Sequence, residues 1–300
     1  MHEQQRLERA RLSLEGLSIG DALGGFFEMS NPRRLSHFVL DRKPPSGEWR
    51  FTDDTNMALS VFEVLRKHQH VDQDALAKSF VEYYDRSRGY GRGMRALVAR
   101  IAKGQPWREA SYSFYGGEGS LGNGGAMRVA PVGGYFADDI PSVVDNARAS
   151  AEITHAHPEG IAGAIAIAVA AAVAHQFKND ISYVEFIDRV VEYLPAGEVE
   201  EGCTRASKLK SDTTALEAAT ELGNGSSMTA QRTVPLAIWF AAKYRDNFEE
   251  AIWQTLSAGG DTDTTCAMVG GIVALVGMKD EIPATWRQQR EPLPAWAFDS

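Results

Sequence analysis

Two short segments of this chain combine carboxylates with hydroxyls, and each stands just before a stretch with helical apolar spacing. Residues 52–55 read Thr-Asp-Asp-Thr, and residues 261–264 read Asp-Thr-Asp-Thr. Hard divalent cations take oxygen ligands, which carboxylates and hydroxyls supply. The two segments therefore predict a shared cation site, although about two hundred residues separate them in the sequence.

A simpler function for each segment is to begin a helix, because Thr caps the first turn and acidic residues complement the helix dipole. Capping uses one side-chain oxygen, whereas each segment carries two acidic residues. The surplus carboxylates would repel one another if the segments met, and a cation removes that conflict. The four negative charges of these acids are enough to neutralise two divalent cations, and they belong to Asp53, Asp54, Asp261 and Asp263.

Two glycine-rich segments accompany the acidic ones. Residues 16–28 carry four glycines and end in Glu28. They predict either a helix packed closely against another, or a backbone that approaches a ligand with Glu28 as ligand or base. Residues 116–125 predict either a flexible surface loop or a run of amides directed at the oxygens of a phosphate or diphosphate. The latter segment is not a Walker loop, since no Lys-Ser or Lys-Thr pair follows it, and no strand precedes it as a Rossmann turn requires.

Residues 154–157 read Thr-His-Ala-His and form the last candidate segment. Two histidines separated by one residue are able to bind zinc, but no cysteine or third histidine lies at ligand spacing. A helix cap or a hydrogen bond to a sugar is therefore the interpretation that we prefer.

Helical periodicity recurs along most of the chain, and strand-like alternation is scarce. One apolar stripe at residues 7, 10, 14 and 17 continues to Asp21. A carboxylate on such a face is costly unless it is paired or bound to a metal. Gly270 and Gly271 would allow the last predicted helix to pack closely. The further helices that we expect cover residues 57–65, 75–84, 94–101, 143–153, 184–193, 233–243 and 268–276.

Bulk properties narrow the class of protein. The net charge of −9 argues against a general nucleic-acid or membrane binder, because both require a basic surface. The longest apolar run, Ile161–Ala174, has 14 residues, and about 20 are needed to cross a membrane, so we expect a buried helix. Two cysteines without a CxxC, and an N-terminal segment without a hydrophobic signal region, favour the cytoplasm. No apolar heptad stripe indicates a coiled coil, so we expect a monomer.

These patterns predict one all-α domain of many helices over residues 1–300. The most polar stretch, residues 177–233, is expected to be a surface excursion. Residues 283–300 contain three prolines and are expected to form an extended tail across the body of the domain.

Taken together and in this order, five motifs resemble the ADP-ribosylglycohydrolase family. The resemblance runs from about Leu12 to Trp286, which is nearly the whole chain. It is carried by Gly20-Asp-Ala-Leu-Gly24 with Glu28, Thr52-Asp-Asp-Thr55, Gly122-Asn-Gly-Gly-Ala-Met-Arg128, Thr154-His155 and Gly259-Gly-Asp-Thr-Asp-Thr264.

The resemblance implies a compact all-α fold with two Mg²⁺ or Mn²⁺ ions in a cleft. The implied metal ligands are Thr52, Asp53, Asp54, Asp261, Asp263 and Thr264. Glu28 would lie at the entrance, and Glu28, Asp53 and Asp54 are the implied candidates for accepting a proton from water. The implied substrate-binding residues are Tyr115, Gly119, Ser120, Leu121, Gly122, Asn123, Gly124 and His155. Tyr115 is the candidate for stacking on adenine, whereas Leu121 occupies a position that is aromatic in some relatives.

The function that the resemblance implies is hydrolysis of the bond between C1″ of ADP-ribose and a modified acceptor group. The substrate would be an ADP-ribosylated protein or a small-molecule conjugate, and ADP-ribose would be the product. Two alternatives stay open: hydrolysis of another ADP-ribose conjugate or of a nucleotide derivative, and binding of ADP-ribose without catalysis. A two-metal phosphohydrolase is disfavoured, because such enzymes more often use histidine ligands. The presence of all the implied metal ligands and of Glu28 favours an enzyme.

Overall fold

The computed structural model describes residues 2–28, 38–277 and 281–299. Within these residues the chain is built from α-helices and short 3₁₀ turns, and its two β-bridges are isolated. The all-α single-domain class predicted from the sequence is confirmed. The helices are α1 (His2–Glu28), α3 (Asp53–His68), α4 (Gln73–Glu82), α5 (Arg92–Ala102), α6 (Trp107–Tyr112), α7 (Ala130–Tyr135), α8 (Ile140–Glu152), α9 (Pro158–Phe177), α10 (Tyr183–Val191), α11 (Glu198–Ser207), α12 (Ala215–Leu222), α13 (Val234–Tyr244), α14 (Phe248–Ser257), α15 (Thr262–Val273) and α16 (Ala284–Gln289).

Every helix expected from apolar spacing is present. The first six of the predicted ranges fall within or beside α3, α4, α5, α8, α10 and α13. The last, residues 268–276, belongs to α15, which begins at Thr262 instead. Its first turn consists of Thr and Asp, which apolar periodicity does not register. The polar first turn is where the second acidic segment lies.

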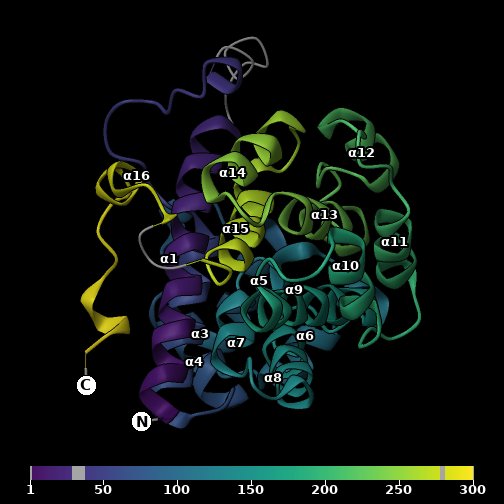
Figure 1. Ribbon diagram of the computed structural model, residues 1–300. Helices are drawn as coiled ribbons and strands as arrows, with labels where there is room; N and C mark the ends of the chain where they lie inside the picture. The colour runs from purple at the N-terminus through teal and green to yellow at the C-terminus, as the bar shows by residue number, and fades with distance from the viewer. Residues whose placement is uncertain (1, 29–37, 278–280, 300) are drawn as a thin grey trace.

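The long helix α1 packs lengthwise against α15 at the centre of the molecule (Figure 1). Glycines four residues apart on α1 form the contact. A Cβ atom at Gly16 would lie 2.3 Å from the carbonyl oxygen of Gly270, and one at Gly20 would lie 2.1 Å from that of Cys266. A Cβ atom at Gly24 would lie 2.3 Å from the carbonyl oxygen of Thr262. The close-packing interpretation of residues 16–28 is therefore confirmed.

Helix α9 forms another part of the core. Residues from Ile161 to Ala174 are all buried, as expected for the longest apolar run. By length and composition α9 is able to cross a membrane, yet 83% of its most apolar window is buried inside the domain. This burial identifies α9 as a core helix of the domain.

Residues 177–233 contain α10, α11 and α12, which are stacked along one side of the domain (Figure 1). Their apolar side chains are covered, since Phe186, Val190 and Cys203 have no exposed surface. The polar residues that dominate this stretch occupy the outer faces of the same helices. The amphipathic pattern is strong in α10, so the polar composition reflects a solvated face.

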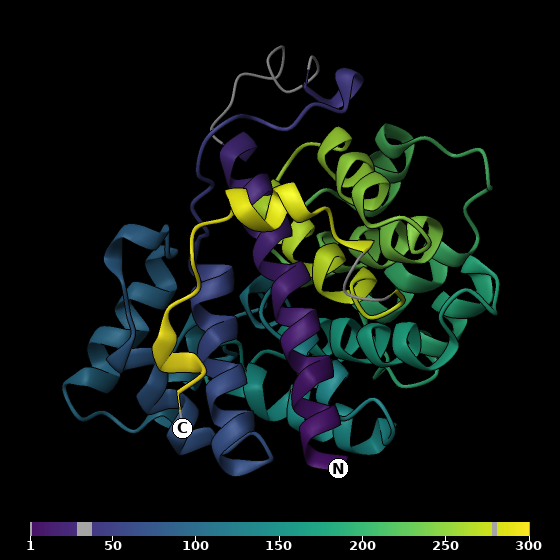
Figure 2. The same cartoon turned by 60° about the vertical axis from the view of Figure 1, so that its left-hand side comes forward.

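The chain from residue 281 onward runs along the outside of α1 and α3, shown in yellow in Figure 2. It begins with α16 and continues without regular structure to a short 3₁₀ turn. The ring of Trp296 stacks on Tyr83 with centroids 3.6 Å apart, and Phe298 contacts Phe62 at 5.4 Å. These aromatic contacts fix the C-terminal segment to the helices beneath it.

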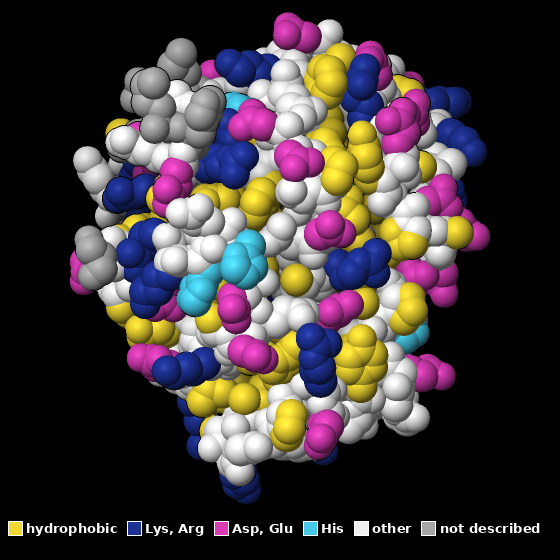
Figure 3. Space-filling model, turned by 90° about the horizontal axis from the view of Figure 1, so that it is seen from below, with side chains coloured by type: hydrophobic (Ala, Val, Ile, Leu, Met, Phe, Trp, Pro, Cys, Tyr) yellow, Lys and Arg dark blue, Asp and Glu magenta, His cyan; other side chains and the backbone are white. Residues whose placement is uncertain are grey.

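Charge is distributed unevenly over the molecule. The chain has 40 Asp and Glu against 31 Lys and Arg. On the face seen in Figure 3, acidic and basic side chains are interspersed with hydrophobic ones. Charges of both signs placed close together leave no single strong field over that face. Concentrated negative charge lies instead inside the site described next.

Candidate functional site

Asp21 lies within α1 with no exposed surface, and its carboxylate meets the N-terminus of α3. It accepts hydrogen bonds from the backbone N–H groups of Thr52 and Thr55 at 3.0 Å, and from Thr52 Oγ1 at 2.8 Å. The first N–H groups of a helix lack intrahelical partners and carry partial positive charge, so they stabilise a buried carboxylate. This arrangement offsets part of the cost expected for Asp21, although burial and the charge of Asp263 still raise its pKa to about 7. It also fixes α3 to α1, with Asp53 and Asp54 at the start of α3.

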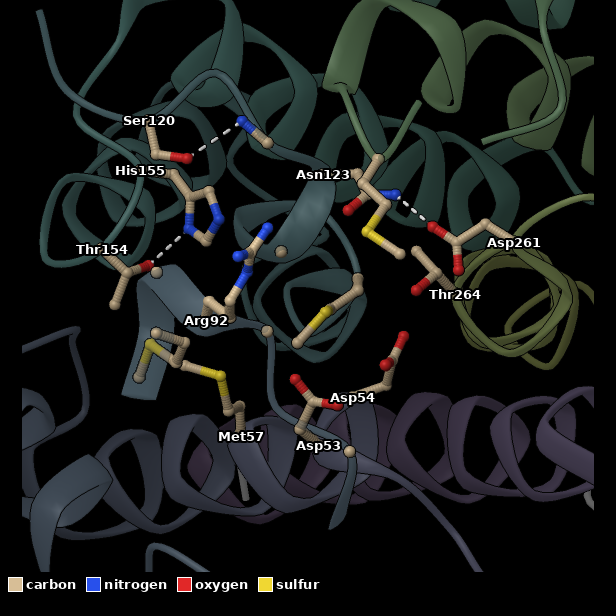
Figure 4. A pocket seen from close by; sticks show the side chains of 18 of the residues that line it. Asp53, Asp54, Met57, Arg92, Ser120, Asn123, Thr154, His155, Asp261 and Thr264 are labelled. Atoms are coloured by element: carbon tan, nitrogen blue, oxygen red, sulfur yellow. Dashed lines mark hydrogen bonds between the residues drawn. The ribbon is translucent and has the colours of Figure 1, made fainter. Parts of the chain in front are cut away.

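The two acidic segments lie together at the N-termini of α3 and α15 (Figure 4). Carboxylate oxygens of Asp21, Asp54 and Asp263 lie within 4.8 Å of one another, and so do those of Glu28, Asp261 and Asp263. Asp263 belongs to both groups, so the groups are continuous. We call the whole set the acidic cluster, and it comprises Asp21, Glu28, Asp53, Asp54, Asp261 and Asp263.

Burial and mutual repulsion raise the pKa values of five acids of the cluster, namely Asp21, Glu28, Asp53, Asp54 and Asp261. Burial, followed by the charges of Asp263 and Asp21, raises the pKa of Asp53 to about 8. Burial and the charge of Asp263 raise the pKa of Asp261 to about 8 and that of Glu28 to about 7. Within the described residues, no ion pair joins a Lys or Arg to the cluster. Among the described residues, the cluster therefore has no ion-pair partner.

Asp54 gives a second, independent indication that cations fit this site. Its Oδ1 atom is buried and has no hydrogen-bond partner among the described residues. Burial, followed by the charges of its neighbours, raises the pKa of Asp54 well above its ordinary value. A buried anionic oxygen without a partner is costly. An oxygen-only donor set of carboxylates and hydroxyls suits Mg²⁺ or Mn²⁺, so the residues present fit such ions.

The two threonines of the implied ligand set are held by the acids beside them. Thr52 Oγ1 lies 2.8 Å from Asp21 Oδ1 and 3.0 Å from Asp54 Oδ2. The backbone N–H of Thr264 donates to Asp263 Oδ1 at 2.7 Å. A hydroxyl that donates its proton to a carboxylate keeps lone pairs for a cation. The Thr52 side chain is thus oriented without losing its capacity to bind a metal ion, and at Thr264 the hydrogen bond fixes the backbone.

A cavity of about 380 Å³ opens beside the acidic cluster. The acids of the cluster other than Asp21 form one wall, and Ser120, Gly122, Asn123 and Gly124 with His155 form the wall opposite (Figure 4). The side-chain amide of Asn123 crosses between them and donates to Asp261 Oδ2 at 2.7 Å and to Thr233 Oγ1 at 3.2 Å. The glycine-rich loop and the acidic cluster are therefore two walls of one site.

Most of the implied substrate-binding residues line this cavity. Those that do are Tyr115, Ser120, Gly122, Asn123, Gly124 and His155. Tyr115 is 68% exposed, and its φ of 51° lies in the left-handed region. Gly119 and Leu121 do not line the cavity. Gly119 packs on the backbone of His157, where a Cβ would lie 2.8 Å from the backbone nitrogen, and the Leu121 carbonyl accepts from Ala230 N–H at 3.0 Å.

The two histidines of residues 154–157 have separate environments. His157 caps α9, because its Nδ1 accepts from the backbone N–H of Glu159 at 3.1 Å. The Nδ1 atom of His155 lies 2.6 Å from Thr154 Oγ1. The cap interpretation is confirmed for His157, and in the described part of the chain neither histidine belongs to a group of potential metal ligands.

Sequence reasoning missed several residues of the cavity. They are Met57, Gly89, Gly91, Arg92, Gly93, Met94, Leu97, Phe114, Met127 and Met228. Arg92 is the one Lys or Arg in the described lining, and its side chain points into the cavity (Figure 4). An arginine between two glycines was the available signal. Apolar residues on helical faces, by contrast, carry no signal that separates a cavity wall from the core.

The fold and site define a single all-α domain with an acidic centre, and comparison with known proteins assigns it to a family. The family model of ADP-ribosylglycohydrolases matches residues 2–298. The chain therefore belongs to the ADP-ribosylglycohydrolase family, whose members are glycohydrolase enzymes. The resemblance inferred from the five motifs is thereby confirmed.

Individual relatives match along nearly their whole lengths. The chain is 30% identical to ADP-ribosylhydrolase ARH3 of Gallus gallus, over 94% of this chain and 89% of that protein. It is 30% identical to ARH3 of Homo sapiens, over 95% of this chain and 90% of that protein. It is 28% identical to ADP-ribosyl-[dinitrogen reductase] glycohydrolase of Rhodospirillum rubrum, over 93% of this chain and 89% of that protein. A solved structure, described as an ADP-ribosylglycohydrolase-related protein complex, shares the fold with a TM-score of 0.61 at 24% identity, over 96% of this chain and 93% of the other.

Proposed function

We propose that this protein uses divalent cations to hydrolyse the bond between C1″ of ADP-ribose and an acceptor group. One observation carries the proposal: the acidic cluster and the glycine-rich loop of residues 120–124 face each other across one cavity. Carboxylates suit cations and a developing positive charge, whereas backbone amides suit a diphosphate. ADP-ribose carries its diphosphate next to the reacting ribose. The names of the relatives as ADP-ribosylhydrolases support the same substrate class.

Two Mg²⁺ or Mn²⁺ ions are the proposed cofactors. The residues proposed to hold them are Thr52, Asp53, Asp54, Asp261, Asp263 and Thr264. The unpartnered oxygen of Asp54 and the raised pKa values of the acids support this proposal, since cations would supply the missing counter-charge. When bound, such ions supply Lewis acidity that lowers the pKa of water.

Glu28, Asp53 and Asp54 are the candidates for accepting the proton of the attacking water, and all three line the cavity. Glu28 ends α1 and is exposed, whereas Asp54 is only 2% exposed. Hydrolysis of a glycoside passes through a positively charged sugar. Carboxylates beside the cavity would stabilise that charge. Glu28→Gln is therefore expected to reduce turnover more than it reduces metal affinity.

The other wall of the cavity is proposed to bind the diphosphate and the adenosine. Ser120 and residues 122–124 form this wall, in which the N–H of Gly122 donates to Ser120 Oγ and that of Asn123 to the carbonyl of Met228. Arg92 at the start of α5 supplies positive charge toward the same cavity (Figure 4). Charge-assisted hydrogen bonds from a guanidinium to phosphate oxygens are short and strong. Tyr115 at the rim is proposed to stack on adenine.

The proposed substrate is an ADP-ribosylated protein or small-molecule conjugate, and the proposed product is ADP-ribose. We propose that the protein acts as a monomer in the cytoplasm. Cys203 and Cys266 are free and buried, which supports a reducing compartment.

A panel of conjugates tests the proposal. Defined peptides carrying ADP-ribose on arginine or on serine are incubated with Mg²⁺, Mn²⁺ or EDTA, and released ADP-ribose is measured. Release should require metal, and Asp261→Asn and Asp263→Asn should abolish release and weaken metal binding. Asp246→Asn, an exposed acid outside the cavity, is the matched control and should behave like wild type.

Other results would reassign the activity. Release from a small-molecule conjugate, with none from any peptide, would favour hydrolysis of another conjugate. Calorimetric binding of ADP-ribose without turnover of any substrate would favour a non-catalytic binding protein. Full activity of Asp263→Asn in EDTA would overturn the metal-dependent mechanism.

A further inference from the structure

A buried relay of hydrogen bonds runs from Arg128 to His155. Arg128 has no exposed surface. Its Nη2 donates to the carbonyl of Ser150 at 2.7 Å and to Thr154 Oγ1 at 2.9 Å, and its Nη1 donates to the carbonyl of Gly124. The hydroxyl oxygen of Thr154 lies in turn 2.6 Å from Nδ1 of His155. The guanidinium thus reaches the imidazole through a single hydroxyl group.

The direction of the hydrogen bond between Thr154 and His155 follows from the one between Arg128 and Thr154. Arginine only donates, so Thr154 Oγ1 accepts from Arg128. The hydroxyl then has its own proton to donate, and within the described residues Nδ1 of His155 is the acceptor in contact with it. A proton on Nδ1 would leave the buried hydroxyl proton without an acceptor, which is unfavourable. Nδ1 of His155 therefore accepts and carries no proton.

The charge state of the ring agrees with this direction. Burial, followed by the positive charge of Arg128, lowers the pKa of His155 to about 3. The ring is therefore neutral at physiological pH and carries one proton. Since Nδ1 accepts from the Thr154 hydroxyl, that proton belongs on Nε2.

The Nε2 atom lies against the glycine-rich loop. A Cβ atom at Gly124 would lie 2.9 Å from Nε2, and one at Gly122 would lie 3.2 Å from it. His155 also lines the cavity (Figure 4). A side chain on either glycine would displace the ring, so the loop leaves room for the imidazole at this position.

We propose that Arg128 and Thr154 are positioning residues that hold His155 as the Nε2–H tautomer, so that His155 donates a hydrogen bond to an oxygen of the bound ligand. In this tautomer Nε2 is not available to accept the proton of water or to bind a metal ion. The ligand oxygen belongs to the diphosphate or to the distal ribose of ADP-ribose, and this part of the inference rests on the proposed function.

Nuclear magnetic resonance of the ligand-free protein tests the tautomer directly. Long-range ¹H–¹⁵N correlation spectra distinguish a protonated from an unprotonated ring nitrogen, and His155→Gln identifies the signals among the seven histidines. Wild type should show an unprotonated Nδ1 and a protonated Nε2. Thr154→Val, which keeps the shape but removes the hydroxyl, should show a mixture of tautomers. Thr154→Ser keeps the hydroxyl and should retain the wild-type signals.

Ligand titrations test the consequence for binding. Thr154→Val should bind ADP-ribose more weakly than wild type by the reciprocal of the fraction of Nε2–H tautomer that its spectra show, about two-fold for an equal mixture, and Thr154→Ser should not. ADP lacks the distal ribose. If Thr154→Val loses the same affinity for ADP as for ADP-ribose, the oxygen that accepts from His155 belongs to the diphosphate. A loss for ADP-ribose alone places the acceptor on the distal ribose.

Two results would overturn the inference. A protonated Nδ1 in wild type contradicts the relay, and this spectrum decides the matter even if Thr154→Val fails to fold. A pure Nε2–H tautomer together with wild-type affinity in Thr154→Val shows that the relay is not needed. Failure of wild type to bind ADP-ribose would instead contradict the proposed function, whatever tautomer the spectra show.

Discussion

The side-chain amide of Asn123 donates a hydrogen bond of 2.7 Å to the carboxylate of Asp261, which joins the glycine-rich loop to the acidic cluster. A hydrogen bond to a metal-binding carboxylate fixes the orientation of that ligand. Asn123→Ala is therefore expected to weaken Mn²⁺ binding by about ten-fold or more. Calorimetric titration of the variant with Mn²⁺, and then with ADP-ribose, should show that both affinities fall.

Asn247→Ala provides the matched control for this substitution. Asn247 caps α14 by accepting from the backbone N–H of Glu250 at 2.9 Å and does not line the cavity. Loss of the cap should lower the free energy of unfolding by about 1 kcal/mol and leave Mn²⁺ affinity unchanged. Equal Mn²⁺ affinities in Asn123→Ala and Asn247→Ala would show that Asn123 does not orient a metal ligand.

The raised pKa values predict that the metal-free protein loses stability as the pH rises. Asp53 and Asp261 titrate near pH 8 when folded, against about 4 in an unfolded chain. The folded state therefore holds more protons over this interval, and by linkage the free energy of unfolding falls as pH increases. Melting temperatures in EDTA should decrease from about pH 6 to about pH 8, and added Mn²⁺ should stabilise more at the higher pH.

Two variants separate this effect from general charge repulsion. Asp53→Asn/Asp261→Asn removes two of the buried acids, so its melting temperature in EDTA should depend less on pH. Asp139→Asn removes one carboxylate at an exposed N-cap, where hydrogen bonds from Ser142 lower the pKa of Asp139, and it should keep the wild-type slope over this interval. Identical slopes in all three proteins would rule out the cluster as the cause.

Arg92 is expected to contribute to ligand affinity through its charge. Arg92→Ala should raise KM for an ADP-ribosylated peptide by about ten-fold, while kcat changes less, because a charge-assisted hydrogen bond to a diphosphate is made in both the ground and transition states. Arg95→Ala removes the same charge one turn later on α5, outside the cavity, and should leave KM unchanged. A similar rise in both variants would indicate long-range attraction instead of contact.

The contact between α1 and α15 is predicted to tolerate no side chain. Gly20→Ala places a methyl group 2.1 Å from the backbone carbonyl oxygen of Cys266, so one helix must move. The free energy of unfolding should fall by about 3 kcal/mol, and Mn²⁺ binding should weaken as α15 shifts. Gly93→Ala meets nothing within 4 Å in α5 and should be neutral or stabilising, by up to about 1 kcal/mol. Denaturant unfolding of both variants measures the difference.

Local pattern accounts for much of this fold. Apolar spacing locates the helices because each buries one face, and it fails at the start of α15, where the first turn is polar. The acid that interrupts the α1 stripe, Asp21, stood out as anomalous, but its partners Thr52 and Thr55 lie more than thirty residues away. Only the tertiary structure shows that a helix N-terminus stabilises this carboxylate.

The candidate site likewise contains residues that the sequence predicts and residues that it does not. Doubled acids and clustered glycines are unusual enough to stand out in a sequence, and the structure gathers them around one cavity. The methionines of the lining belong to ordinary amphipathic patterns, so nothing local distinguishes them, whereas the two glycines beside Arg92 are a local signal for that residue. Gly119 and Leu121 lie within the right loop, yet their backbone contacts turn them away from the cavity. Which members of a loop face a ligand depends on those contacts.

The packing of α1 on α15 also sets an order of events during protein synthesis. Helix α1 leaves the ribosome long before α15, and its glycine-lined groove stays open until residues 262–273 have been translated. Asp261 and Asp263 arrive with that last segment, so a nascent chain that stops before it has only part of the acidic cluster. Capture of the proposed cations should therefore be a late step, completed only when the start of α15 has reached α1.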